Sequence, residues 1–194
     1  SVGGAGFYVP WSVAARPEGV LYVLSRGLEA KDGKPIDITR IGHWTMDQEF
    51  IGDFARNEMT WPVSIALDSD GNLYCSEEYE NIIAIYNEDG ERTGQWGETG
   101  AAEGQLDGPS GLAFDREDNL LVVDARNSRV QKFTRDGEFL SAFGTAGSDA
   151  GQFDEPWGIS VDAGGSVYVA DWGNSRVQKF SPAGDHLLTF GGPD

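Results

Sequence analysis

The sequence DWGNSRVQKF at residues 171–180 occurs 47 positions earlier as DARNSRVQKF at residues 124–133. Eight of the ten residues are identical. Agreement of this density at a fixed spacing indicates internal duplication, and a period of roughly 20–50 residues is typical of repeat architectures. We therefore expect the chain to be built from copies of one unit.

The repeat extends in both directions until it covers the chain. Residues 104–144 align with residues 151–191, and a more diverged copy 47 positions earlier places Pro62 beneath Pro109. A further step of 52 positions places Pro10 beneath Pro62. We expect a single domain over residues 1–194 with four units, at about residues 7–55, 59–97, 106–144 and 153–191.

Each unit has the pattern of four short strands. In the fourth unit an apolar stretch (158–162) and a β-branched and aromatic stretch (166–171) are separated by a glycine-rich turn. A polar corner, the alternating VQKF (177–180) and a final LLTFG (187–191) follow. Four antiparallel strands in about 45 residues are typical of a β-propeller blade. The predicted fold class is therefore all-β, a propeller of four-stranded blades.

The motif of the unit is P-x-G-[apolar]-x-[apolar]-D, then an apolar strand ending in Asp, then N-S-R-V-Q-K-F and a closing Gly. It resembles the NHL repeat, with the best agreement in the third and fourth units and the weakest in the first. NHL propellers usually have six blades, so the resemblance implies that these four units are part of a larger ring. Further sequence, a second chain or a second copy would then cover two open blade faces.

The composition narrows the possible partners. The chain has 14 Lys and Arg residues against 32 Asp and Glu residues, for a net charge of −18. This charge opposes nucleic-acid binding, which needs clustered cations to neutralise phosphates. No apolar run reaches the roughly 18 residues of a membrane span. We therefore expect a protein or a small-molecule ligand as the partner.

The first unit carries an insertion of ten residues between its second and third strands, within residues 26–36. Gly33 and Pro35 predict that this insertion is an irregular loop. It should open on the face that also carries the connections between blades. Because loops on a rigid scaffold often carry function, this face is the predicted recognition face.

Acidic residues in the second unit are candidates for a metal site. Glu77, Glu78 and Glu80 follow its second strand on the same face, and hard cations such as calcium prefer several oxygen ligands. The alternative is a solvated acidic loop. The nearby DSDGN (68–72) resembles the start of a calcium loop but lacks the later ligands, so we interpret it as a turn.

Residues that break the repeat are candidates for ligand binding. Directly after the proline of each blade the units have Trp11, Val63, Ser110 and Trp157, and a further tryptophan, Trp172, lies at the following corner. Exposed tryptophans there would line a pocket, although packing between blades is the alternative. The predicted ligand-binding residues are Trp11, Trp157, Trp172, Arg126 and Ser110.

Other polar residues recur in successive units. Asp124, Asn127 and Arg129 are duplicated 47 positions later, which favours a structural role within each blade. Cys75 aligns with valines, which predicts a buried thiol that acts as a small apolar side chain. These residues are therefore not candidates for the site.

Catalytic chemistry has little support in the sequence. The two histidines, His43 and His186, fall in opposite or nearly opposite blades, and a zinc site needs three or four convergent ligands. The favoured function is a binding or scaffold module. The alternative is a hydrolase or lyase of the lactonase or amidating-lyase kind, with a carboxylate-bound divalent cation in the channel.

Overall fold

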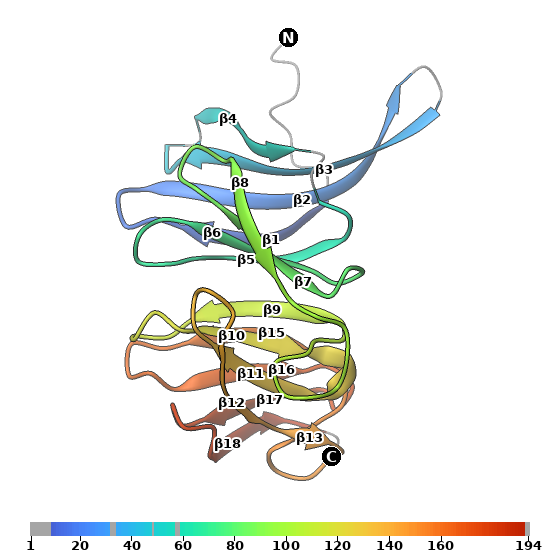
Figure 1. The fold of residues 1–194 in the computed structure, drawn as a ribbon, viewed down its shortest axis with the longest axis vertical. Coiled ribbons are helices and arrows are strands. Elements are labelled where there is room, and N and C mark those ends of the chain that lie inside the picture. The colour runs from blue at the N-terminus through green and yellow to red at the C-terminus, as the bar shows by residue number, and fades with distance from the viewer. Residues whose placement is uncertain (1–8, 32–33, 48, 57–58, 193–194) are drawn as a thin grey trace.

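The computed structural model describes residues 9–31, 34–47, 49–56 and 59–192. Their strands form four antiparallel sheets of four strands each, named blades 1 to 4 in chain order (Figure 1). Within each blade the strands are hydrogen-bonded in sequence order. The predicted propeller of four-stranded blades is therefore confirmed. Phe7, the predicted start of the first unit, lies outside the described residues.

The strands of the four blades have the following bounds. Blade 1 contains β1 (Pro10–Ala15), β2 (Val20–Lys31), β3 (Lys34–Thr45) and β4 (Phe50–Arg56). Blade 2 contains β5 (Pro62–Leu67), β6 (Leu73–Glu77), β7 (Ile82–Tyr86) and β8 (Arg92–Trp96). Blade 3 contains β9 (Pro109–Phe114), β10 (Leu120–Asp124), β11 (Arg129–Phe133) and β12 (Phe139–Phe143), with the 3-10 turn η1 (Ala125–Asn127) between β10 and β11. Blade 4 contains β15 (Pro156–Val161), β16 (Val167–Asp171), β17 (Arg176–Phe180) and β18 (His186–Gly191).

The loop that leads into blade 4 carries two short strands. They are β13 (Thr145–Ala146) and β14 (Gln152–Phe153), which pair in parallel. The loop into blade 3 has a single bridge at the matching place, between Thr99 and Leu106. Both loops are therefore shaped in the same way, as the 47-residue repeat predicts.

The blades follow one another along the long axis of the molecule. The first strands β1, β5, β9 and β15 lie next to one another in that order. In Figure 1 blade 1 is at the top and blade 4 at the bottom, with blades 2 and 3 between them. We call the face where second strands end and third strands begin the loop face, and the opposite face the turn face.

The insertion in blade 1 is not an irregular loop. β2 and β3 pair continuously from Val20 with Thr45 to Lys31 with Lys34, so the inserted residues lengthen a hairpin. This hairpin projects beyond the other blades at the upper right of Figure 1. The prediction treated Gly33 and Pro35 as residues that interrupt regular structure. An Asp-Gly pair in the sequence between two strands is, however, a strong signal for a hairpin. Residues 32 and 33 themselves lie outside the described residues.

Among the described residues the core consists of three apolar clusters, one between each pair of neighbouring blades. Side chains of a strand alternate between its two faces, so each middle blade contributes to two clusters. In β10, Leu120 and Val122 pack toward blade 2, whereas Leu121 and Val123 pack toward blade 4. Cys75 is fully buried in the first cluster, and burial raises the pKa of its thiol, as expected for a packing residue.

The turns on the turn face repeat in detail. Asp68, Asp115 and Asp162 each accept hydrogen bonds from the backbone N–H groups two and four residues later. The DSDGN stretch is therefore a turn that recurs in successive blades. Gly137 shows why glycine is needed in the next turn, because at φ +87° a Cβ atom would lie 2.5 Å from the Trp96 ring.

Candidate functional site

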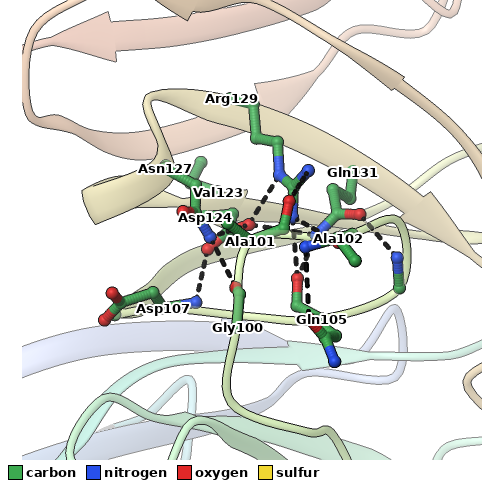
Figure 2. A network of polar contacts seen from close by, with 12 residues as sticks. Gly100, Ala101, Ala102, Gln105, Asp107, Val123, Asp124, Asn127, Arg129 and Gln131 are labelled. Atoms are coloured by element: carbon green, nitrogen blue, oxygen red, sulfur yellow. Dashed lines mark hydrogen bonds and ion pairs between the residues drawn. The ribbon is translucent and has the colours of Figure 1, made fainter.

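A buried polar network holds the loop that leads into blade 3 (Figure 2). The Asp124 carboxylate is fully buried and accepts hydrogen bonds from the Asn127 Nδ2, Arg129 Nε and Gln131 Nε2 atoms at 2.9, 2.8 and 3.0 Å. It also accepts one from the backbone N–H of Asp107, at 2.7 Å. In Figure 2 the donor side chains surround the carboxylate and point toward the loop.

The cationic part of the network binds backbone carbonyls. Arg129 donates to the carbonyl oxygens of Ala101, Ala102 and Gln105 at 3.0, 2.8 and 2.9 Å. The Asn127 side chain donates to the Gly100 carbonyl at 2.9 Å. The loop is therefore fixed through its main chain, in addition to the burial of its Leu106 side chain in the core.

Blade 4 repeats this network 47 residues later. Asp171 accepts from Asn174, Arg176 and Gln178, and Arg176 donates to three carbonyls of the loop into blade 4. A set that forms the same internal bonds in two blades serves the blade and not a ligand. The expected structural role of the duplicated residues agrees with these contacts.

Blade 2 has lost most of the network. Glu77 stands where blade 3 has Asp124, but Ile82 and Ala84 replace the arginine and the glutamine. The buried Glu77 carboxylate accepts from the Thr60 backbone N–H at 2.7 Å and lies 3.5 Å from the Arg92 guanidinium. Burial raises the pKa of Glu77, and the Thr60 hydrogen bond and the Arg92 charge oppose this rise.

The three glutamates proposed as metal ligands are held by different partners. Glu78 forms an ion pair with Arg126 at 2.7 Å, and Glu80 accepts a hydrogen bond from the Thr60 hydroxyl at 2.7 Å. Among the described residues no three Asp, Glu, His or Cys side chains are grouped so that they could hold a metal ion. This placement gives no support to the predicted calcium site at Glu77, Glu78 and Glu80.

A stack of one arginine and two tryptophans lies on the loop face where blades 1 and 2 meet. The Arg26 guanidinium carbon is 4.3 Å from the centre of the Trp11 ring and 4.1 Å from that of the Trp61 ring. Arg26 also donates to the Pro62 carbonyl, at 3.1 Å. The two tryptophans remain 43% and 48% exposed. The cation therefore orders both indoles while they still face solvent.

Charged and aromatic side chains continue this surface toward blade 3. Arg126 bridges Glu78 and Asp107, at 2.7 and 3.2 Å, and links the corners of blades 2 and 3. Tyr79, next to Glu78, is largely exposed. We call the set Trp11, Arg26, Trp61, Glu78, Tyr79 and Arg126 the aromatic patch.

The remaining predicted ligand residues lie in or beside blade 4. Trp157 and Trp172 are both exposed. Trp157 follows Pro156 and Trp172 follows Asp171, and since Pro156 and Asp171 pair across two strands, both tryptophans lie on the loop face. Ser110, in contrast, is fully buried, and its hydroxyl donates to the Trp157 carbonyl at 3.0 Å. Ser110 therefore packs blade 3 against blade 4 and is not part of an exposed surface.

The histidines are far apart in the fold. His43 lies on β3 in blade 1, between Tyr22 and Phe54, with ring centres 6.0 Å from each. Burial lowers the pKa of His43, although the Gly52 backbone and Asp53 oppose this. His186 lies on β18 in blade 4, beside Phe180. Since these blades are at opposite ends of Figure 1, the two imidazoles do not share a site.

Sequence reasoning missed three members of the aromatic patch, namely Tyr79 and the two residues Trp61 and Arg26 of the stack. Trp61 precedes the proline of blade 2, where the later units have Gly108 and Glu155, so it breaks the repeat. Arg26 is the first residue of the insertion in blade 1. Both departures are visible in the aligned units. Their stacking requires blades 1 and 2 to lie next to each other. The sequence of a single unit does not contain this information.

Comparison with protein families supports the repeat assignment. The family model of the NHL repeat matches residues 106–133 and 153–180, in blades 3 and 4. A search of the curated proteins finds no match. Within the described residues, no helix is long and apolar enough to cross a membrane.

Solved structures share the fold at low sequence identity. A virginiamycin B lyase from Staphylococcus aureus is similar with a TM-score of 0.65 and 22% identity, over 93% of this chain and 55% of that chain. A chain of a nidogen/laminin complex has a TM-score of 0.61 and 18% identity, over 94% and 80% of the two chains. A putative gluconolactonase has a TM-score of 0.59 and 16% identity, over 97% and 79%.

The present chain spans about half the length of the lyase that it resembles. At these identities the similarity concerns the fold alone. Three findings agree with one another. The blades are four-stranded, the polar network of blade 3 recurs with the same hydrogen bonds 47 residues later in blade 4, and the family model matches these two blades. The chain is therefore an NHL-repeat β-propeller protein.

Proposed function

We propose that this protein is a binding module that recognises a protein partner through the loop face. The observation that carries the proposal is the stack of Trp11, Arg26 and Trp61. Tryptophan, tyrosine and arginine are the residues most enriched among those that dominate binding energy at protein interfaces. Two ordered and exposed indoles therefore support a docking role for this surface.

The pattern of the repeat supports the same surface. Blades 3 and 4 keep the buried network around Asp124 and Asp171, whereas blade 2 has exchanged it for other residues. At the loop face of blade 2 these changes coincide with Trp61 and Tyr79, both of which are exposed. The blades that have diverged from the repeat thus carry most of the aromatic patch.

The shape of the molecule favours a protein over a small ligand. Two hollows of about 400 and 480 Å³ are lined by the turns at Asp68, Asp70 and their neighbours, on the turn face. The residues of the aromatic patch do not line either hollow. Exposed aromatic side chains outside a cavity suit a broad contact with another macromolecule.

The alternative function is a propeller hydrolase or lyase with a carboxylate-bound cation. Its support comes from the lyase and gluconolactonase structures, which share the fold, and fold alone does not carry activity. In this chain the loop-face carboxylates of Glu77, Glu78 and Glu80 are engaged by Arg92, Arg126 and Thr60. The binding module therefore has the stronger support.

Substitution of Trp61 by alanine tests the proposal. A library of random peptides displayed on phage serves as the probe, with selection against the whole chain and affinity measurement of the selected peptides by calorimetry. Because hot-spot aromatic residues contribute about 2 kcal/mol or more, Trp61→Ala should weaken the selected peptides by a factor of about 30. The Trp11→Ala variant should have a similar effect.

The matched control is Leu187→Ala, which removes an exposed apolar side chain from the outer strand of blade 4. It should leave peptide affinity unchanged. The melting temperatures of Trp61→Ala and Leu187→Ala should both stay close to that of the parent chain. Peptides that bind Trp61→Ala and Trp11→Ala as tightly as the parent would refute the proposed recognition surface.

A further inference from the structure

The loop face of blades 2 and 3 is acidic around the aromatic patch. The described connections on this face of the two blades are residues 59–61, 78–81, 97–108 and 125–128. In these connections Arg126 is the one basic residue, whereas five carboxylates reach the surface. The five belong to Glu78, Glu80, Glu98, Glu103 and Asp107. Blades 2 and 3 each pack between two neighbours, so these side chains are exposed with both neighbours in place.

Three of the five carboxylates form no ion pair with a described residue. Arg126 pairs with Glu78 and Asp107, at 2.7 and 3.2 Å. The remaining three, in contrast, have no cationic partner in the part of the chain that the structure describes. They are Glu80, Glu98 and Glu103. This surface therefore carries negative charge that the protein itself does not neutralise.

The corner between β6 and β7 brings this charge next to Trp61. The backbone N–H of Glu78 donates to the Trp61 carbonyl at 3.0 Å, and the Thr60 hydroxyl donates to the Glu80 carboxylate at 2.7 Å. These two bonds join the acidic corner to the loop that carries the indole. The exposed ring of Trp61 and the Glu80 carboxylate therefore belong to one ordered surface.

Tyr79 adds a second aromatic ring between two carboxylates. It lies between Glu78 and Glu80 at the same corner, and it is 77% exposed. The face of an aromatic ring attracts a cation, and a charged hydrogen bond to a carboxylate is about twice as strong as a neutral one. The corner thus offers both kinds of contact to one cationic group.

The stack of Trp11, Arg26 and Trp61 indicates which cation suits these rings. The Arg26 guanidinium carbon lies 4.3 and 4.1 Å from the centres of the two indole rings. A planar guanidinium stacks on aromatic rings and forms paired hydrogen bonds to carboxylates, whereas the lysine ammonium is a compact point charge. Arg26 comes from blade 1 and Trp61 from the loop into blade 2, so the contact joins separate elements, as a contact with a partner does.

We propose that the partner of the aromatic patch is an arginine-rich segment of a protein. This inference rests on the proposed binding function and adds the chemistry of the partner. The guanidinium groups of the segment stack on Tyr79 and on the exposed part of Trp61, and they bind carboxylates such as Glu80. The net charge of −18 attracts such a segment at longer range and speeds its association.

Two labelled synthetic peptides test the proposal on the whole chain. One consists of repeated Arg-Gly-Ser triplets, and the other has lysine in place of each arginine. Fluorescence anisotropy should show that the arginine peptide binds more tightly, and that its affinity falls as sodium chloride screens the attraction. No binding of the arginine peptide, or equal affinity for both peptides, would overturn the proposal.

A pair of charge reversals locates the contact. Glu80→Lys should weaken the arginine peptide about tenfold, because an attraction at the patch becomes a repulsion. Glu117→Lys is the matched control, since it changes the net charge equally but lies in the turn at residues 115–119 on the turn face, where it is exposed. It should change the affinity less than about twofold, because solvent and salt screen charges at this distance. Equal losses in both variants would show attraction by net charge alone and overturn the proposal.

Glu80→Gln separates the charge of Glu80 from its hydrogen bond. Glutamine keeps a side-chain oxygen that accepts from the Thr60 hydroxyl, so the loop that carries Trp61 stays joined to the corner. Glu80→Gln should still weaken the arginine peptide, by less than Glu80→Lys does. If the affinity of Glu80→Gln equalled that of the parent chain, the charge would not be recognised, and the proposal would fail.

The peptides selected from the random library distinguish this inference from the proposed function. We expect them to be enriched in arginine and to bind Glu80→Lys and Trp61→Ala more weakly than the parent chain. Peptides that depend on Trp61 but lack arginine and bind Glu80→Lys normally would overturn the arginine-rich partner and leave the binding module standing. Peptides that depend on neither Trp61 nor Trp11 would refute the recognition surface itself.

Discussion

Replacement of Asp124 by alanine is expected to lower the free energy of unfolding by about 3–5 kcal/mol, the usual cost of removing one partner from a buried ion pair. Asp124 is fully buried and pairs with Arg129 at 2.8 Å. Its removal also leaves the Asp107 N–H without its acceptor and takes one of two acceptors from the side-chain amides of Asn127 and Gln131. Urea unfolding followed by fluorescence measures this loss.

Asp107→Ala is the matched control for Asp124→Ala. Asp107 takes part in the network through its backbone N–H, which the substitution keeps, and its exposed side chain pairs with the exposed Arg126. Loss of such a surface pair should cost less than about 1 kcal/mol. If Asp124→Ala were as mild as Asp107→Ala, the network would not be what fixes the loop into blade 3.

Replacement of Phe153 by alanine should cost about 3–5 kcal/mol, as is usual when a large aromatic side chain is removed from a core. Phe153 is fully buried between blades 3 and 4, with its ring centre 5.5 Å from that of Phe180. It comes from the loop into blade 4 and also packs against Gly144. The substitution would leave a cavity between blades 3 and 4 and weaken their packing. Thermal unfolding should therefore show a lowered melting temperature.

The variant Phe153→Leu separates the effect of lost side-chain volume from the effect of the lost aromatic ring. Leu106 occupies the same place in the loop into blade 3 and is also fully buried, so the repeat itself accepts leucine there. We expect Phe153→Leu to cost markedly less than Phe153→Ala, because less volume is lost. Equal losses would mean that the aromatic contact with Phe180, and not the filled volume, stabilises the junction.

Most of the fold could be predicted from the sequence, because an assignment made in one unit can be checked at the aligned positions of the other units. Strand positions, the DSDGN turn and the buried thiol of Cys75 were all read from aligned copies. The structural role expected of Asp124 and Asp171 followed from their duplication, and the matching hydrogen bonds give its physical basis. Residues that are the same in aligned copies are those that every blade needs for its structure.

The candidate site was harder to predict for the same reason. Trp61 and Arg26 have no counterpart in the later units, and their stacking needs two blades in place. Ser110 was expected at the surface because it aligns with Trp157, but the close approach of β9 to β15 buries it. The insertion in blade 1 was read from its glycine and proline, whereas pairing between β2 and β3 continues through it.

If the aromatic patch binds a protein partner, as we propose, a bound peptide should protect the loop face of the unmodified chain. Amide hydrogen exchange, with and without a peptide selected from the random library, measures this protection. Slower exchange should appear around Trp61 and Glu78, with no change in the turns at Asp68 and Asp115 on the turn face. Protection of those turns, with exchange near Trp61 unchanged, would contradict the claim.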